Sequence, residues 1–339
     1  MKKILLSIFS FALFFSCEKE IIKVPDGYGV SELKKPEGDY VVDNSFKRVA
    51  YSWGNIDPVL FDTTKLDYLT HVHFAFLYPK EDGSLTALSN EVRFESLNEL
   101  AISKGVKTAI SLAGDENVYR TIASSAAVRK AFVKNVVEFA VRNNLSGIDL
   151  DWEYPRANYG SDVTFALLVK ELSLELHSWH KYLSIAVTAG VFNGPVKDGI
   201  TKEAIDAVDF VNLMAYDAIG RDAQQPSHHS TYAIANKVLD VWLLEKNVPK
   251  EKVVLGVPAY GLDVADNPRT YANLLAAGAD PNADSFIIDK IEYYYNGIAT
   301  IKAKTELAKS RGNGVMFWEY SQDTKGANSL IKAAYEVSK

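Results

Sequence analysis

Short apolar runs alternate with longer amphipathic stretches along the chain from residue 47 onward. Several runs are apolar on both faces, as strands of a buried parallel sheet are. Eight runs fit this description: residues 48–52, 69–77, 106–112, 146–152, 183–189, 208–215, 253–259 and 314–318. The stretches between them favour helices, for example residues 93–103, 125–143, 163–179, 231–245, 298–310 and 327–337. Eight strands alternating with helices over about 290 residues predict an α/β fold, the (β/α)8 TIM barrel.

The pattern predicts one barrel domain over residues 47–339, without a second domain or an internal repeat. A doubly wound open sheet is the alternative, but no Gly-rich nucleotide-binding loop follows the first run. Only about 35 residues separate Gly261 from the helix at 298–310. We therefore expect at most a reduced insertion between the seventh strand and the seventh helix.

The first 46 residues differ from the rest of the chain. Lys2 and Lys3 precede an apolar run at 4–15, which is too short to span a bilayer and is typical of a signal peptide. Residues 18–46 contain Pro, Gly and many charged side chains but no periodic apolar face, which predicts a linker or loosely packed arm.

The signal-like segment, residues 1–17, ends in Ser16 and Cys17, which resembles a bacterial lipobox, although Phe14 stands where Leu is usual. This resemblance implies lipid attachment to Cys17 and anchoring in the bacterial outer membrane. The acidic cluster at 18–20 resembles the signal that places some lipoproteins at the cell surface. The alternative is an ordinary signal peptide with an incidental Cys, and hence a secreted or periplasmic protein.

Composition excludes several classes of function. The net charge of −6 offers no basic face for nucleic acid. Because Cys17 is the chain's one cysteine, the fold has no disulfide, cysteine metal site or thiol nucleophile. His177 and His180 are three residues apart near Glu175, but a helix flank explains them better than a metal site. We expect no cofactor and no metal, and we expect a monomer.

The run at 146–152 leads into three acidic residues with alternating spacing, Asp149, Asp151 and Glu153. Side chains in a strand alternate between faces, so these carboxylates point to one side. Stacked carboxylates repel one another and are costly to bury, which indicates a function. Active sites in this barrel lie at the carboxyl ends of the strands, and Glu153 lies nearest that end. The opposite face of the run carries Ile148, Leu150 and Trp152.

The sequence Gly-Ile-Asp-Leu-Asp-Trp-Glu-Tyr-Pro at 147–155 resembles the signature of the family 18 glycoside hydrolases, the chitinase family. Four supporting segments lie at the ends of other predicted strands, in the order that the family has them. They are Ser-Leu-Ala-Gly at 111–114, Met-Ala-Tyr-Asp at 214–217, Pro-Ala-Tyr-Gly at 258–261 and Val-Met-Phe-Trp at 315–318. The resemblance covers roughly residues 47–339.

The resemblance implies how these residues act. Glu153 would protonate the leaving oxygen, and Asp151 would hold the N–H of the substrate's 2-acetamido group, whose carbonyl is the nucleophile. Tyr216 would bind the acetamido oxygen, and Asp149 would support Asp151 and share a proton with it. Further implied substrate-binding residues are Asp217, Trp318, Ser111, Tyr260 and Tyr51, and Ser111 would also support Asp149. Simpler interpretations are core packing for Trp318, a helix cap for Asp217 and a turn hydrogen bond for Ser111.

The sequence departs from the family pattern in several places. Ser146 replaces the signature's leading Asp, a change that we expect to affect local structure more than chemistry, and Ala113 replaces a frequent Gly. Asp115 stands where many members have a Trp, and no Trp follows the segment 217–220. We therefore expect weak stacking on the leaving-group side, or stacking by other residues. With the reduced insertion, this predicts a shallow groove, open at both ends and suited to endo cleavage.

Four functional hypotheses follow. The first is a retaining endo-glycosidase that cleaves β-1,4-linked N-acetylglucosamine polysaccharides or oligosaccharides, such as chitin. The second is an endo-β-N-acetylglucosaminidase acting on the chitobiose core of N-glycans. The third is a non-catalytic carbohydrate-binding protein, although such relatives typically lose the acid at the position of Glu153. The fourth is an enzyme that uses Glu319 as a protein nucleophile. Adjacent residues of a strand point to opposite faces, so Trp318 and Glu319 cannot both face inward, which disfavours this hypothesis.

Overall fold

The computed structural model describes residues 21–23, 32–53 and 62–339. The signal-like segment and Cys17 lie outside these residues. The chain divides into two compact units, Met1–Glu37 and Gly38–Lys339. In the first unit, β1 (Ile21–Lys23) pairs antiparallel with β2 (Glu32–Lys34). No helix within the described ranges is both long and apolar enough to cross a bilayer.

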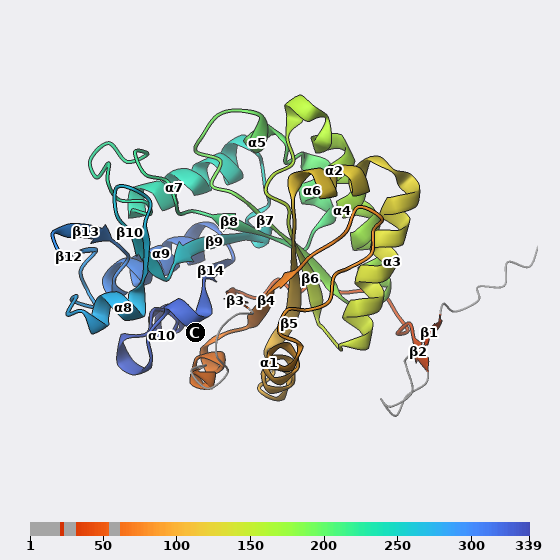
Figure 1. Ribbon diagram of the computed structural model, residues 1–339, viewed down its shortest axis with the longest axis horizontal. Helices are drawn as coiled ribbons and strands as arrows, with labels where there is room; N and C mark the ends of the chain where they lie inside the picture. The colour runs from red at the N-terminus through yellow and green to blue at the C-terminus, as the bar shows by residue number, and fades with distance from the viewer. Residues whose placement is uncertain (1–20, 24–31, 54–61) are drawn as a thin grey trace, which may run out of the picture. The chain divides into compact units, whose positions relative to one another are not determined.

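Eight parallel strands of the second unit close into a barrel, with helices outside it (Figure 1). The barrel closes where β14 pairs with both β3 and β9. Each predicted apolar run overlaps one of these strands, so the predicted (β/α)8 fold is confirmed. The strands are β3 (Lys47–Trp53), β4 (His71–Leu77), β5 (Lys107–Ala113), β6 (Gly147–Asp151), β7 (Tyr182–Thr188), β8 (Phe210–Met214), β9 (Val253–Pro258) and β14 (Gly314–Trp318).

Helices follow the strands much as the pattern predicts, and each of the six exemplified helical stretches overlaps one. The helices around the barrel are α1 (Glu91–Ser103), α2 (Glu116–Ser124), α3 (Ala126–Arg142), α4 (Ser161–Ser178), α5 (Pro195–Asp198), α6 (Lys202–Ala207), α7 (Tyr232–Asp240), α9 (Ile298–Arg311) and α10 (Leu330–Ser338). The six stretches do not cover α2, α5 or α6. Asp115 begins α2 by accepting a hydrogen bond from the Asn117 amide at 2.8 Å, which explains an acidic residue there.

A small antiparallel sheet lies between β9 and α9 (Figure 1). It contains β10 (Tyr260–Leu262), β11 (Pro268–Thr270), β12 (Ser285–Ile288) and β13 (Ile291–Tyr294), in the order β11-β10-β13-β12, with α8 (Tyr271–Ala276) between β11 and β12. This sheet and its one helix are the reduced insertion that the chain length between Gly261 and α9 predicts.

The strand register places polar side chains in one layer inside the barrel. Asp149 of β6 lies opposite Ser111 of β5 and Ser184 of β7. The predicted alternation holds, because Trp152 instead packs outside the barrel against α2 and α4. Its ring centroid lies 5.2 Å from that of Tyr119 and 5.6 Å from that of Phe165.

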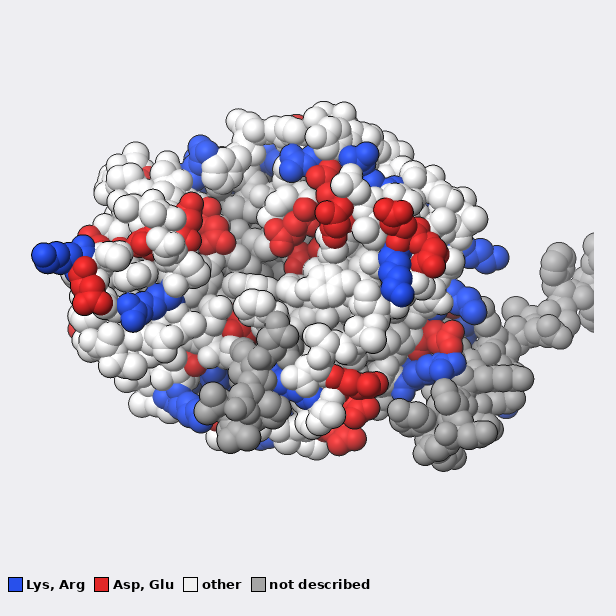
Figure 2. Space-filling view, in the orientation of Figure 1, with Lys and Arg blue, Asp and Glu red and all other residues white. Residues whose placement is uncertain are grey.

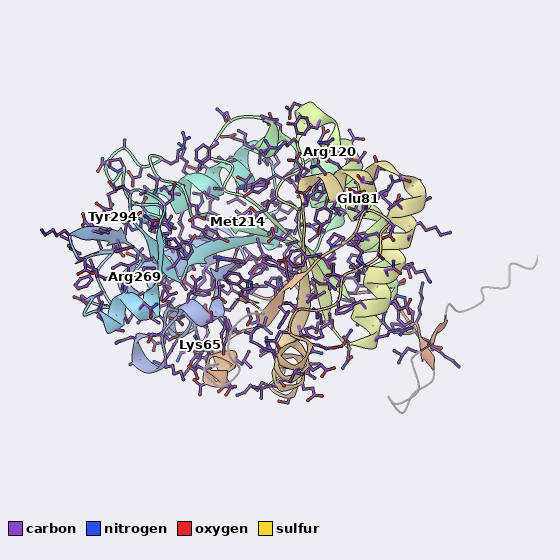
Figure 3. All side chains as sticks on the ribbon, viewed as in Figure 1. Lys65, Glu81, Arg120, Met214, Arg269 and Tyr294 are labelled. Atoms are coloured by element: carbon purple, nitrogen blue, oxygen red, sulfur yellow. The ribbon has the colours of Figure 1, made fainter. Side chains whose placement is uncertain are left out.

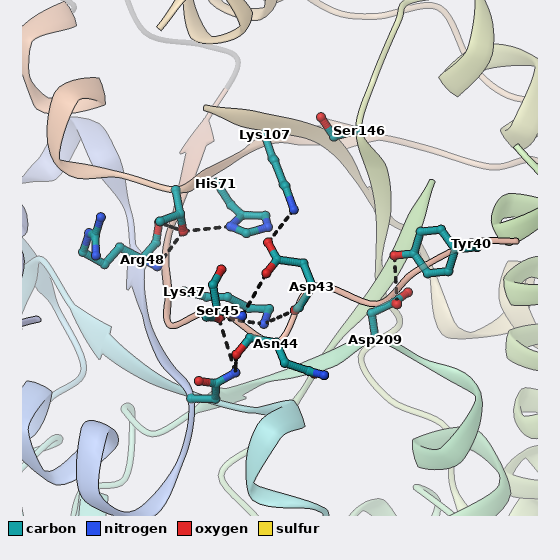
Figure 4. A network of polar contacts seen from close by, with 12 residues as sticks. Tyr40, Asp43, Asn44, Ser45, Lys47, Arg48, His71, Lys107, Ser146 and Asp209 are labelled. Atoms are coloured by element: carbon teal, nitrogen blue, oxygen red, sulfur yellow. Dashed lines mark hydrogen bonds and ion pairs between the residues drawn. The ribbon is translucent and has the colours of Figure 1, made fainter. Parts of the chain in front are cut away.

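Residues 38–46, which the sequence pattern assigns to the arm, pack against the amino-terminal end of the barrel (Figure 4). The Tyr40 ring stacks on His177 at 4.2 Å between centroids, and its hydroxyl donates to Asp209 at 3.0 Å. Lys107 donates to Asp43 at 2.6 Å. A cavity of about 640 Å³ adjoins these contacts, at the end of the barrel opposite the predicted catalytic residues.

Candidate active site

A cavity of about 500 Å³ opens at the carboxyl ends of β6, β7, β8 and β14. Its lining includes five predicted site residues: Asp151, Glu153, Tyr216, Asp217 and Trp318. Met214 of β8, which also lines it, lies near the middle of the view in Figure 3. In the same view, Asp and Glu side chains gather on both sides of a central hollow (Figure 2). The lining contains three carboxyl groups and no Lys or Arg, so it favours positive charge.

The three carboxylates rise from the barrel interior toward solvent. Asp149 is fully buried, Asp151 is 4% exposed, and Glu153 is exposed. The strand ends at Asp151, so Glu153 lies just beyond β6 and not within it. The order predicted from the alternation is therefore present, with Glu153 at the mouth.

Four side chains donate hydrogen bonds to the buried carboxylate of Asp149. Tyr51 and Ser111 donate to Oδ2 at 2.7 and 2.8 Å. Ser184 and Asn212 donate to Oδ1 at 2.5 and 3.2 Å. These bonds offset the cost of burying the group.

These contacts place two predicted residues. Tyr51 and Ser111 are buried, lie outside the cavity lining and donate to Asp149. For Ser111 this is the support of Asp149 that the family resemblance implies. No hydrogen bond joins Asp149 to Asp151, so the expected shared proton is not seen between them in this arrangement. The donors to Asp149 occupy both of its oxygens instead.

Asp151 has the opposite environment. Its Oδ1 atom is buried and has no hydrogen-bond partner within the described part of the chain. Burial, the nearby Glu153 and then Asp149 raise the pKa of Asp151 well above its usual value. Asp151 therefore retains a proton at a pH where an isolated carboxyl group has lost it.

Tyr216 and Asp217 follow β8 and reach the cavity together. Burial, with Asp151 and Asp217 nearby, raises the pKa of Tyr216 well above its usual value, so its hydroxyl remains a donor. The Tyr260 hydroxyl donates to Oδ1 of Asp217 at 2.5 Å. Tyr260 is buried and outside the lining, and it supports Asp217. Asp217 does not cap α7, because Thr231 does.

The pattern of site residues is that of a known family. The family described as "Glycosyl hydrolases family 18" matches residues 47–323. The chain belongs to this family. A chitinase crystal structure from Bacteroides thetaiotaomicron is 27% identical, with a TM-score of 0.76, over 86% of this chain and 96% of that one.

Two further relatives agree with this family 18 assignment. A chitinase from the chitin utilization locus of Flavobacterium johnsoniae is 28% identical, with a TM-score of 0.72, over 87% of this chain and 94% of that one. Chitinase 1 of Aphanocladium album is 26% identical over 359 residues, which cover 84% of this chain and 83% of that protein.

In this family 18 barrel, Trp318 and Glu319 have different environments. Trp318 is partly buried, lines the cavity and stacks on Phe76 at 5.7 Å between ring centroids. It is therefore more than core packing. Glu319 is 1% exposed, lies outside the lining and accepts hydrogen bonds from the backbone amides of Trp53 and Ser321. This placement argues against Glu319 as a protein nucleophile.

Several residues of the family 18 site escaped sequence reasoning. Ser184 and Asn212 bind Asp149. The alternation along β7 and β8 places both side chains inside the barrel, and this was the signal that could have identified them. Tyr154 lines the cavity, and burial and a hydrogen bond with Glu153 raise its pKa. Phe192, on the loop after β7, also lines the cavity and is 45% exposed.

His177 and His180, for which the sequence favours a helix flank over a metal site, bind separate partners. His177 binds Asp209 at 2.9 Å, whereas His180 binds the Gly38 carbonyl at 3.0 Å. Within the described ranges, no group of three or more His, Cys, Asp or Glu residues is arranged to hold a metal ion.

Proposed function

We propose that this family 18 chain is a retaining, endo-acting glycosidase that cleaves β-1,4 bonds of N-acetylglucosamine polymers with the help of the substrate's own acetamido group. One observation carries the proposal. The carboxylates of Asp149, Asp151 and Glu153, here called the ladder, become steadily more exposed toward the barrel mouth. The outer two line a single cavity with Tyr216 and Trp318. The chitinases to which the chain is similar support N-acetylglucosamine as the sugar.

The reaction begins with the sugar of subsite −1 on Trp318. The acetamido carbonyl oxygen attacks the anomeric carbon, the bond from that carbon to the leaving oxygen breaks, and Glu153 gives its proton to the leaving oxygen. The product is an oxazolinium ion. Water then attacks the anomeric carbon, Glu153 takes a proton from that water, and the ring of the oxazolinium opens. Two inversions retain the configuration.

Asp151 and Tyr216 hold the acetamido group during this reaction. The Tyr216 hydroxyl donates to the acetamido oxygen and orients it toward the anomeric carbon. Asp151 accepts the N–H, and its carboxylate stabilises the positive charge that develops on the oxazolinium ion. The raised pKa of Asp151 keeps a proton in the Asp151–Glu153 pair, and that proton must lie on Glu153 when the bond breaks.

The small insertion supports endo cleavage, because a four-stranded sheet and one helix build a lower wall than a full domain would. Digestion of long chitin oligosaccharides tests this point. We expect cuts at internal bonds from the first turnovers. Strictly processive release of dimers from chain ends would contradict the open groove.

The proposal is tested with matched substrates. Chitin oligosaccharides should be hydrolysed with retention, while the same oligosaccharides without the 2-acetamido group should not react. Turnover of the deacetylated substrates would contradict the substrate-assisted mechanism. N-glycoproteins should be screened in parallel, because release of N-glycans with no turnover of chitin would favour the chitobiose-core enzyme.

A further inference from the structure

The turn that presents Tyr216 and Asp217 to the cavity has an unusual backbone. Residues 215–231 connect β8 to α7, and Asp217 has a φ of +53°. This left-handed conformation is uncommon outside glycine, although Asp adopts it more readily than most residues, and surrounding contacts stabilise it. The contacts that stabilise it therefore decide where the Tyr216 hydroxyl and the Asp217 carboxylate lie.

His229 and Ser230 contact this turn and lie outside the cavity lining, and we call this pair the backing of the turn. The Ser230 hydroxyl donates to the Ala215 carbonyl at 2.8 Å, and the Ala218 amide donates to the His229 carbonyl at 3.0 Å. Nδ1 of His229 lies 3.3 Å from Oδ1 of Asp217. The start of the segment is thus fixed to its end.

Lys304 of α9 donates hydrogen bonds to this backing. It is fully buried, and its Nζ donates to the Ser230 carbonyl at 2.6 Å, the Ser230 hydroxyl at 2.8 Å and Oδ1 of Asn296 at 2.6 Å. Asn296 also donates to the Ser230 carbonyl, at 2.8 Å. The Lys304 ammonium therefore uses three bonds to uncharged acceptors, two of them on one residue of the backing.

Burial makes this position expensive for a cation. It lowers the pKa of Lys304 to about 7, and Asp284 opposes the shift. A methionine or leucine would fill the same space without this cost. The described hydrogen bonds of this amino group are to Ser230 and Asn296, and both residues adjoin the turn.

We propose that Lys304 is a positioning residue for the glycosidase reaction, which through Ser230 fixes the turn that carries Tyr216 and Asp217. The inference rests on the proposed function. Lys304 lies outside the cavity lining and does not touch the sugar. If the turn loosens, the acetamido oxygen loses its alignment with the anomeric carbon, while Trp318 still holds the ring. The loss therefore falls on kcat more than on KM.

Lys304→Met tests the inference, since it keeps the chain length of the side chain and removes Nζ. Lys302→Met is the control on the same helix, because Lys302 pairs with Glu336 at the surface. We expect Lys304→Met to lower kcat on chitin oligosaccharides about tenfold or more with KM within about twofold, and Lys302→Met to match the wild type. Unchanged kcat per folded Lys304→Met molecule would overturn the proposal and leave a packing role.

Ser230→Ala gives a second and milder test, because it removes the hydroxyl that joins Lys304 to Ala215. It should also lower kcat, and the double variant should lose less than the product of the single losses. If Lys304→Met does not fold, wild-type kcat in Ser230→Ala overturns the proposal. A wild type without turnover of chitin oligosaccharides would contradict the proposed function, whereas an active wild type with unaffected variants would contradict only the role of Lys304.

Discussion

At the scale of single residues, the two inner carboxylates of the ladder differ in how they are satisfied. Asp149 accepts four hydrogen bonds inside the barrel. Asp151 has a buried oxygen without a partner in the described part of the chain, and two other carboxylates lie close to it. Asp149 is thus held in place by its hydrogen bonds. Asp151 has an oxygen available to accept an N–H from a substrate, and the burial of that unpaired oxygen lowers the stability of the folded protein.

Asp151→Asn should therefore stabilise the protein while it abolishes most activity. At pH 7 we expect the melting temperature to rise by roughly 2 °C or more, since about 1 kcal/mol shifts a large domain by that much. We expect turnover to fall by about a hundredfold or more, because the amide cannot carry the compensating charge. Thermal unfolding and initial rates measure both effects.

The pH dependence of that stabilisation has a definite sign. The folded-state pKa of Asp151 is raised, so above about pH 4 the folded chain binds more protons than the unfolded chain does. Wild-type stability attributable to Asp151 therefore falls as the pH rises from about 4 through the folded-state pKa. The advantage of Asp151→Asn should grow over that window and vanish near pH 3. An advantage that is the same at pH 3 and pH 7 would contradict the assigned cause.

At the scale of elements, strands were predictable and side-chain partners across the barrel were not. The strands that carry Asp149 and Trp318 can be recognised from the local pattern of apolar residues, which a single sequence contains. The bonds from Ser184 and Asn212 to Asp149 depend on the register and closure of the barrel, which no local pattern specifies. The support of Asp217 by Tyr260 depends on how β10 meets the loop after β8, which no local pattern specifies.

The loop after β7 also supplies an aromatic residue, Phe192, to a cavity for which the family motifs predicted few aromatic side chains. Phe192 lines the cavity after β7, the neighbour of the strand that leads to Glu153, whereas Trp318 ends β14, three strands from β7 in the barrel order. The Arg221 guanidinium lies 3.6 Å from the centroid of the Phe192 ring, and Arg221 is outside the lining. One ring face is thus covered by a cation, and we propose that the ring stacks on the leaving-group sugar.

Phe192→Ala should raise KM for chitin oligosaccharides about fivefold, the effect of losing about 1 kcal/mol of aromatic contact. Tyr232→Ala is the control, because Tyr232 is similarly exposed at the start of α7 but outside the lining. The effect should disappear for substrates whose leaving group is too small to reach Phe192. Equal KM values for long oligosaccharides in both variants would contradict the assigned stacking.

At the scale of the whole molecule, the barrel presents its acidic mouth at the end away from residues 38–46. We propose that Cys17 carries a lipid anchor and that the protein resides in the bacterial outer membrane with its barrel at the cell surface. The signal-like start and the lipobox-like Ser16-Cys17 support this proposal, although they lie outside the described residues.

Cys17→Ala should move the protein from the membrane fraction to the soluble fraction, since the lipid supplies the membrane affinity. Fractionation of cells that express either form measures this directly, and protease treatment of intact cells reports surface exposure. Equal solubility of the wild type and the variant would favour the ordinary signal peptide.

The central claim is that Glu153, at the top of the ladder, is the acid of a glycosidase. Its most direct test compares wild type with Glu153→Gln on chitin oligosaccharides, with turnover and binding measured on the same preparations. Glutamine keeps the size of the side chain and removes the proton, so we expect turnover to fall by about a hundredfold or more while binding stays within about threefold. Retained turnover in folded Glu153→Gln would contradict the account.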